Sequence, residues 1–181
     1  TEGAELVAVD GNVMLALGGS FAYARDTTGA LRVWGDNQFG QLGRGHTSQS
    51  YKVLDFRTKN ADVDISLLRD VVTGSDFSFL WMEDDTLWGV GNNAYLNVAP
   101  RGGSYSTQKK INTPEKPAAL ACGFSHVLLL TENGDVYTWG RNGEYQLANG
   151  NRKNSFQPSK VDVQNIVQIA PLAFMRGRTL N

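Results

Sequence analysis

The chain has 181 residues, 41% hydrophobic and 19% charged, which is typical of a globular protein with a substantial core. Its 17 basic and 18 acidic residues nearly cancel, so it lacks the basic excess of most nucleic-acid-binding proteins, and nucleic acid is not expected as a partner. No apolar run of about eighteen residues is present and no basic segment precedes the apolar patches of residues 4–18, so no signal peptide and no membrane partner is expected.

Three stretches of the chain repeat one pattern, and they begin roughly fifty residues apart at Gly18, Gly74 and Gly123. Each opening glycine is followed by a ring, a turn, a Trp or Val, a second glycine and an asparagine, always at the same offsets. The matching positions are Phe21, Phe77 and His126; Gly29, Asp85 and Gly134; Trp34, Val90 and Trp139; Gly35, Gly91 and Gly140; and Asn37, Asn93 and Asn142. A repeat of this length indicates an array of one supersecondary unit.

Each unit has the pattern of a β-meander. In the first, "AYAR" and "LRVWG" flank a "DTTG" turn, and in the third "HVLLLT" and "DVYTWG" flank "ENG", an Asn-Gly hairpin turn. An apolar run precedes each opening glycine ("VMLAL", "SLLRDVV", "PAALAC"), and such runs predict inner strands buried on both faces. No sustained helical stripe is present, so little helix is expected.

Two polar stretches, residues 44–64 and 99–116, separate the units and are predicted to be surface loops. Loops on a rigid scaffold often carry binding residues, so partner contacts are expected there and in the basic tail. The candidates are Arg44, His46, Tyr51, Arg101, Tyr105, Arg176 and Arg178.

The residues that could carry chemistry have simpler structural interpretations. His126 is expected to be a hydrogen-bonded structural ring, and His46 a solvated loop residue. Cys122, the single cysteine, is expected to be a buried thiol, which excludes an internal disulfide and a Cys-based zinc site. The acidic run 83–85 falls at a hairpin turn, and Trp81 and Trp88 are expected to pack in strands. We therefore expect no catalytic residue, no cofactor and no metal, and an intracellular location in a compartment that the sequence does not specify.

The segments "VWGDNQFGQLGRG" and "HVLLLTENGDVYTWGRN" resemble repeats of the regulator of chromosome condensation family, also known as alpha-tubulin suppressor-like repeats. The family pattern is Gly-x-x-His, a strand, a Gly turn, Trp-Gly-x-Asn and Gly-Gln-Leu-Gly. The second copy departs from it, with Val90 at the Trp position and "LNVA" (residues 96–99) in place of Gly-Gln-Leu-Gly.

This resemblance implies an all-β fold with four-stranded antiparallel blades. About three blades are expected, half of a seven-bladed propeller. The repeats are placed at residues 14–66, 67–116 and 117–163, with the start of a fourth at 164–181, and together they form one partial propeller over 1–181. Three blades are too few to close a ring. The chain is then a piece of a longer protein, is completed by other chains, or forms an open arc with unpaired edges.

Two functions follow from this interpretation. The first is a non-catalytic protein-interaction or scaffold module within a larger protein or complex, with protein partners that complete the propeller edges. The alternative is guanine-nucleotide exchange on a small GTPase, an activity that the family resemblance implies but whose residues cannot be matched here. An enzyme of another kind has no supporting constellation of residues.

Overall fold

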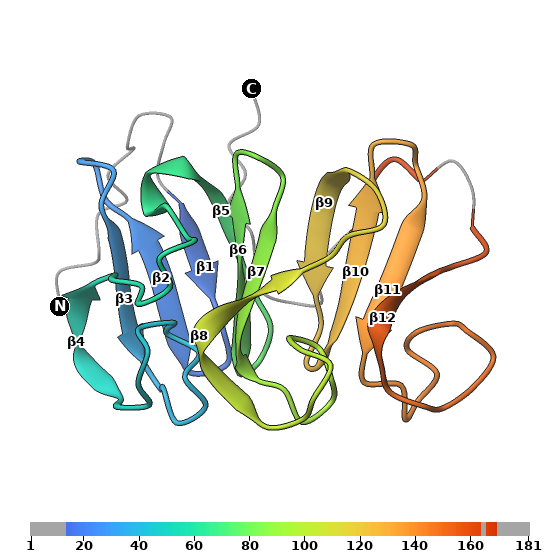
Figure 1. Ribbon diagram of the computed structural model, residues 1–181, viewed down its shortest axis with the longest axis horizontal. Helices are drawn as coiled ribbons and strands as arrows, with labels where there is room; N and C mark the ends of the chain where they lie inside the picture. The colour runs from blue at the N-terminus through green and yellow to red at the C-terminus, as the bar shows by residue number, and fades with distance from the viewer. Residues whose placement is uncertain (1–13, 164–165, 170–181) are drawn as a thin grey trace, which may run out of the picture.

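The computed structural model describes residues 14–163 and 166–169, and it is built almost entirely of β-strands (Figure 1). The strands form three four-stranded antiparallel sheets, blades 1, 2 and 3, in each of which neighbours in sequence pair. Blade 1 contains β1 (Leu15–Leu17), β2 (Phe21–Arg25), β3 (Leu31–Gly35) and β4 (Ser50–Asp55); blade 2 contains β5 (Leu68–Thr73), β6 (Phe77–Met82), β7 (Leu87–Asn92) and β8 (Ser104–Ile111); blade 3 contains β9 (Pro117–Cys122), β10 (His126–Thr131), β11 (Val136–Gly140) and β12 (Ser155–Lys160). Within the described part, the only helix is a 3-10 turn, η1 (Ile65–Leu67). The predicted partial propeller is confirmed.

The blades are arranged around their inner strands, β1, β5 and β9, which follow one another side by side. The hydroxyl of Thr73 donates to the Leu17 carbonyl at 2.6 Å, and the Gly19 N–H donates to the Ser75 carbonyl at 2.8 Å. Each blade thus has a front face, turned toward the preceding blade, and a back face, turned toward the following one. In this arc, the front face of blade 1 and the back face of blade 3 have no blade against them among the described residues.

Two hydrophobic clusters fill the spaces between blades. Between blades 1 and 2, the back-face residue Tyr23 packs in one cluster with Leu80 and Trp88. Between blades 2 and 3, the Phe79 ring meets Trp139 edge-on, with centroids 6.2 Å apart. Because successive side chains of a strand point to opposite faces, every blade contributes one row of side chains to each neighbour. The core therefore lies between the blades.

The polar stretches predicted as loops contain the outer strands β4 and β8, so that prediction was wrong. An outer strand pairs on one side only and is largely solvated, and therefore polar residues predominate in it. Gln108 in β8 is an exception, because its side chain is 2% exposed. Its amide donates to the Gly43 carbonyl at 2.7 Å and accepts from the Thr58 hydroxyl at 2.7 Å. This buried amide attaches blade 2 to blade 1.

The inner strands are not all buried on both faces as predicted. Leu15 and Leu17 of β1 are 54% and 42% exposed, whereas the matching Leu120 and Cys122 of β9 are 2% and 3% exposed. Burial on both faces requires a blade on each side, and blade 1 has none on its front face within the described ranges. The apolar run identified a strand correctly, but its burial depends on neighbouring blades that a local pattern cannot reveal.

The predicted repeat boundaries remain predictions, although each sheet falls inside one of the expected ranges. The expected start of a fourth repeat falls largely outside the described residues. Its described part, residues 166–169, contains no strand.

Candidate functional site

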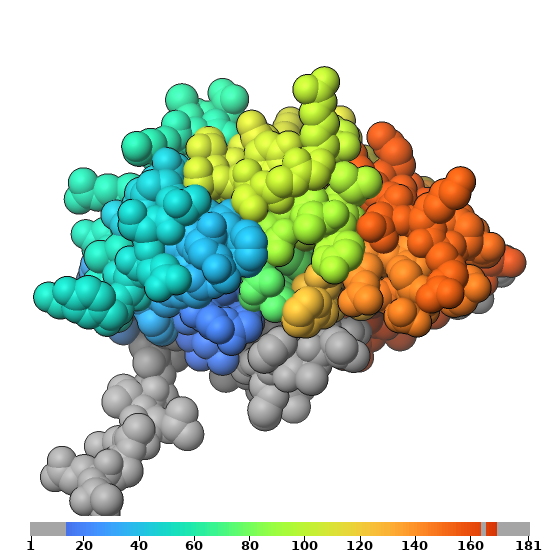
Figure 2. Space-filling model, turned by 90° about the horizontal axis from the view of Figure 1, so that it is seen from below, coloured from blue at the N-terminus to red at the C-terminus, as the bar shows by residue number. Residues whose placement is uncertain are grey.

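The connections between strands gather at two ends of the blades (Figure 1). The loop end contains the short turns 18–20, 74–76 and 123–125 and the long loops 36–49, 93–103 and 141–154. Figure 2 looks onto this end. The hairpin end contains the tight turns 26–30, 83–86 and 132–135 and the links between blades. The two ends differ in how their polar groups are satisfied.

A fully buried asparagine holds each long loop together. The Asn37 amide donates to the carbonyls of His46 and Ser48, both at 2.9 Å, and its side-chain oxygen accepts from the Leu42 N–H at 2.9 Å. Asn93 makes the equivalent set of bonds in its loop, and Asn142 does so with one difference, since it donates to the Asn149 side-chain oxygen in place of one backbone carbonyl. An asparagine side chain carries both donors and an acceptor, so it can satisfy both strands of an irregular loop. The loops are consequently rigid supports for the residues at their surface.

The same loops attach each blade to the next. The Gln41 carbonyl accepts from the Tyr23 hydroxyl at 2.8 Å and from Ser78 of blade 2 at 3.0 Å. At the matching position, the Asn97 carbonyl of blade 2 accepts from the Trp139 indole of blade 3 at 2.9 Å. In blade 2, Val90 stands at the Trp position and has no indole N–H to donate to the preceding blade. The Ser78 hydroxyl makes the corresponding bond to the Gln41 carbonyl.

Arginines on the loop end stack on tyrosines. The Arg141 guanidinium lies 5.4 Å from the Tyr95 ring centroid and joins blade 3 to blade 2, while Arg152 lies 5.3 Å from the Tyr145 ring. Among the described residues, Arg141 forms no ion pair. Tyr145 is 57% exposed, and Phe124, which precedes the Ser125 carbonyl that accepts from the Arg141 N–H, is 61% exposed. Arg152 also pairs with Glu144 at 3.7 Å, so the guanidinium that this end leaves available to a carboxylate is that of Arg141.

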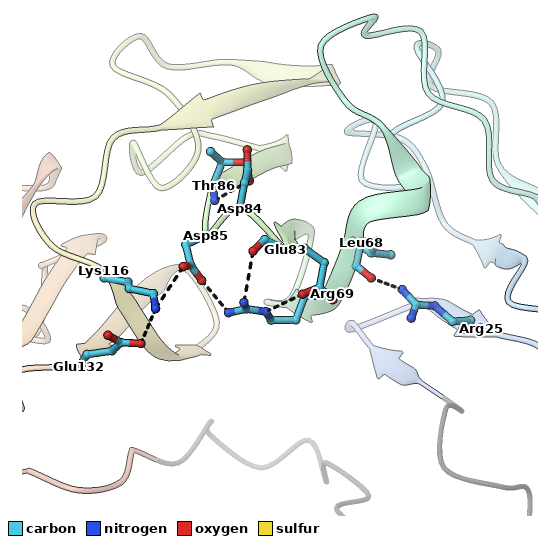
Figure 3. A network of polar contacts seen from close by, with 9 residues as sticks. All are labelled: Arg25, Leu68, Arg69, Glu83, Asp84, Asp85, Thr86, Lys116 and Glu132. Atoms are coloured by element: carbon cyan, nitrogen blue, oxygen red, sulfur yellow. Dashed lines mark hydrogen bonds and ion pairs between the residues drawn. The ribbon is translucent and has the colours of Figure 1, made fainter.

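Charges at the hairpin end pair with one another (Figure 3), and the Arg69 guanidinium also lies 5.1 Å from the Trp81 ring centroid. Arg69 contacts Asp85 at 2.6 Å and Glu83 at 3.6 Å. Lys116, at the start of blade 3, contacts Glu132 at 2.7 Å and Asp85 at 3.6 Å, and the contact with Glu132 raises the pKa of Lys116. The acidic run 83–85 is a hairpin turn as predicted, but two of its three carboxylates join an ion-pair network across two blades.

The shallow hollow of about 410 Å³ beside this network is lined by Asp84, Lys110 and Glu115, among others. The Asp84 carboxylate accepts from the Thr86 hydroxyl and N–H, which lowers the pKa of Asp84. Glu115 accepts from Tyr137 and Asn133. Since these charges already have partners within the chain, the hollow is a weaker candidate for a site than the loop end.

Comparison with known families gives two matching models, both described as regulator of chromosome condensation (RCC1) repeat. One matches residues 15–41 and 118–146, and the other matches residues 133–170. The chain carries RCC1 repeats. The matches fall on the first and third copies, in agreement with the eroded sequence of the second.

RCC1-repeat proteins are also found among the relatives. The Ultraviolet-B receptor UVR8 of Arabidopsis thaliana is 29% identical over 154 residues, 82% of this chain and 33% of the receptor. The mitochondrial RCC1 domain-containing protein RUG3 of Arabidopsis thaliana is 28% identical, covering 88% of this chain and 37% of RUG3. The chain thus spans about a third of the length of these relatives.

Solved structures share the fold. Yeast RCC1 (Prp20), in its complex with Kap60, superposes with a TM-score of 0.68 at 21% identity, over 83% of this chain and 37% of Prp20. Human WBSCR16 superposes with a TM-score of 0.69 at 22% identity, over 86% and 39% of the two chains.

His126 occupies the family's histidine position but differs from the prediction in one respect. Its ring lies over Gly123, where an added Cβ would come within 2.2 Å of the ring, as the Phe21 and Phe77 rings lie over their own opening glycines. Among the described residues it forms no side-chain hydrogen bond, so the predicted bond was wrong. Burial and the nearby Arg141 guanidinium lower the pKa of His126. It is a structural ring that packing holds in place.

The predicted contact residues of this RCC1-repeat chain fall into two groups. Arg44, His46 and Arg101 lie in the long loops, and Tyr51 and Tyr105 lie near the starts of β4 and β8, so all five sit toward the loop end. Within this group, Arg44 approaches His46 at 3.5 Å and Tyr105 donates to the Arg101 carbonyl at 3.0 Å. Arg176 and Arg178 lie outside the described residues. A role in binding remains a prediction for all seven.

The sequence interpretation missed the Arg141–Tyr95 stack. Arg141 is the variable residue of Trp-Gly-x-Asn, where the other copies have Asp36 and Asn92. Tyr145 replaces the first glycine of Gly-Gln-Leu-Gly. Tyr145, which stacks with Arg152, does depart from the repeat pattern, but Arg141 and Tyr95 stand at variable positions, so the pattern carried no signal for their contact.

Other residues are packed as expected. Cys122, Trp81 and Trp88 are 3%, 5% and 9% exposed and belong to the clusters between blades. In the described ranges, no group of three or more histidine, cysteine or acidic residues could hold a metal ion. No described helix is long and apolar enough to cross a membrane.

Proposed function

We propose that this RCC1-repeat chain is a non-catalytic protein-interaction module, acting within a larger protein or complex, and that the loop end binds the partner. The observation that carries the proposal is the Arg141–Tyr95 stack, because its guanidinium has no ion-pair partner in the described part of the chain. Arginine and tyrosine are the residue types that dominate binding energy at protein interfaces.

The partner that fits this surface is a protein segment carrying carboxylates. Stacking on Tyr95 restricts the Arg141 side chain and leaves its N–H groups available for bidentate bonds to a carboxylate. Arg101 adds a second exposed cation from the neighbouring loop. Yeast RCC1 (Prp20) supports this proposal by analogy. One of its structures is a complex with Kap60, and another is described together with its binding to Gsp1p and histones.

The test compares the wild-type chain with the double variant Arg101→Gln, Arg141→Gln by cross-linking in cells and quantitative mass spectrometry. Proteins captured by the wild type should be reduced about tenfold with the double variant, because two charged contacts are lost. Arg57→Gln is the matched control, since it removes an exposed arginine from the hairpin end and should leave capture unchanged. Equal capture by all three chains would refute a loop-end site, and a partner-free chain would refute the interaction module.

The exchange alternative has a direct assay of its own. Nucleotide release from a panel of small GTPases should be no faster with the chain than without it. Acceleration for any GTPase would replace the proposed function with guanine-nucleotide exchange. One relative is described as an X-linked retinitis pigmentosa GTPase regulator homolog from Caenorhabditis elegans, 28% identical over 72% of this chain, which makes the assay worth performing.

A further inference from the structure

Three side chains with hydrogen-bond donors meet around Gly45, where the long loop of blade 1 reaches strand β8 of blade 2. Arg44 and His46 flank this glycine, and Nη1 of Arg44 lies 3.5 Å from Nε2 of His46. Lys59 comes from the link between the two blades. Its aliphatic stem lies over Gly45, where an added Cβ would come within 2.6 Å of the Lys59 Cδ. We call Arg44, His46 and Lys59 the Gly45 cluster.

Strand β8 holds both contributing segments in place. The Gly45 N–H donates to the Ser106 carbonyl at 2.8 Å, which fixes the loop. The Asn60 amide donates to the Gln108 carbonyl at 3.0 Å, which fixes the link next to Lys59. Because the backbone beneath the cluster is already ordered, a ligand that binds there does not have to order it.

The hydrogen bonds of His46 make its ring a donor toward Arg44. The Ser48 N–H donates to Nδ1 of His46 at 3.1 Å, so Nδ1 is the acceptor nitrogen of the ring and the proton lies on Nε2. The Arg44 guanidinium carries donors only. Two donors that face each other cannot bond to each other, so the geometry favours an acceptor oxygen that both of them reach.

The positive charges of the cluster are not neutralised by the described part of the chain. Arg44 and Lys59 form no ion pair there, and the buried Nε of Arg44 has no acceptor, which is uncommon in folded proteins. Asp36, a carboxylate of the same loop, accepts instead from the side-chain amides of Gln41 and Gln49. The cluster therefore offers two positive charges to an anion.

We propose that the Gly45 cluster binds a phosphate monoester carried by a partner protein, such as a phosphoserine. A phosphate monoester carries a charge of about −1.5 to −2 at neutral pH and so matches the two cations, whereas a carboxylate leaves one of them unpaired. Its three oxygens can accept from all members of the cluster at once. Lys59 is exposed, so a phosphate on a larger molecule can reach it.

This inference goes beyond the loop-end site of the proposed function and does not rest on it. The cluster belongs to blade 1 and its link to blade 2, and it contains neither Arg101 nor Arg141. The double variant Arg101→Gln, Arg141→Gln should therefore bind a phosphate monoester as tightly as the wild-type chain does. Failure of one site is distinguishable from failure of the other.

NMR titration of the isotope-labelled chain with short peptides tests the proposal. A Gly-Ser-Gly peptide with phosphorylated serine should shift the amide signals of residues 44–48 and bind with a Kd of about 1 mM or tighter. The unphosphorylated peptide and a Gly-Glu-Gly peptide should bind at least about tenfold more weakly. Absence of binding by the phosphopeptide, or equal binding by the glutamate peptide, would overturn the proposal. Inorganic phosphate that binds as tightly as the phosphopeptide would overturn a partner protein as the source of the phosphate.

Substitutions locate the binding in the cluster. Arg44→Gln should weaken phosphopeptide binding by more than about tenfold, because it removes a charged donor. Arg57→Gln is the matched control, since Arg57 is an exposed arginine on the same link and its substitution should leave the affinity unchanged. If Arg44→Gln fails to fold by circular dichroism, Lys59→Gln at the surface replaces it. Equal losses in the cluster variant and in Arg57→Gln would overturn the proposal, because general surface charge would then account for the binding.

Discussion

The hairpin end and the loop end of the blades differ in where their stabilising polar contacts lie. At the hairpin end, carboxylates and cations pair on the surface, as Arg69, Asp85 and Lys116 do, and such pairs contribute little stability in water. At the loop end, buried amides such as Asn37 hold the loops together, and the surface residue Arg141 stacks on the Tyr95 ring. The contacts that stabilise the loop end are therefore buried, whereas the residues proposed to bind a partner lie at its surface, so we expect the surface residues to vary without loss of the fold.

The largest expected difference comes from one substitution at each end. Asn37→Ala should lower the free energy of unfolding by about 3 kcal/mol, because it leaves two carbonyls and one N–H of the loop without partners. Arg69→Gln should lower it by less than about 1 kcal/mol, since its ion pairs are solvated. Urea denaturation of both variants measures the difference. Equal losses would show that the ion-pair network is as important as the buried amides.

Substitution of two tryptophans, Trp139 and Trp81, tests the same difference between the loop end and the hairpin end. Trp139→Phe should cost about 2 kcal/mol, because it removes the bond to the Asn97 carbonyl and leaves that buried group without a donor. Trp81, toward the hairpin end, has a buried indole N–H with no partner in the described structure, so Trp81→Phe should cost less than Trp139→Phe. Thermal unfolding of the two variants provides the ranking, and the reverse order would contradict it.

A smaller effect of opposite sign is expected from restoring the family glycine. Ala148 occupies the last position of Gly-Gln-Leu-Gly with a φ of 50°, where the first copy has Gly43 at 64°. Ala148→Gly should raise the free energy of unfolding by about 1 kcal/mol, because a Cβ disfavours the left-handed conformation. Asp85→Gly is the contrast at the hairpin end: Asp85 has a φ of 64°, but it also forms ion pairs, so its gain should be smaller. Chemical denaturation of both variants checks the order.

The fold was predictable from the sequence because the residues that define the repeat make their contacts within a single copy. Gly18 permits the Phe21 ring to lie over it, and Asn37 completes its own loop, so both are visible within one copy. The outer strand β8 was not predictable, since its burial at Gln108 depends on Gly43, which is 65 residues away. The Arg141–Tyr95 stack depends likewise on two variable positions in different copies. Contacts between blades could not be predicted, because each of them joins residues from two different copies of the repeat.

The smallest expected effect concerns pH and the loop-end ring His126. Burial and Arg141 lower its pKa in the folded chain below the ordinary value of 6.5, so the folded state binds the proton less readily than the unfolded state. Its contribution to stability is therefore present above the unfolded pKa and is lost as pH falls through the folded pKa. His126→Phe, which restores the ring of the other two copies, should reduce the loss of stability between about pH 7 and pH 5. Urea midpoints at both pH values measure it, and an unchanged loss in the variant would assign the acid sensitivity to other groups.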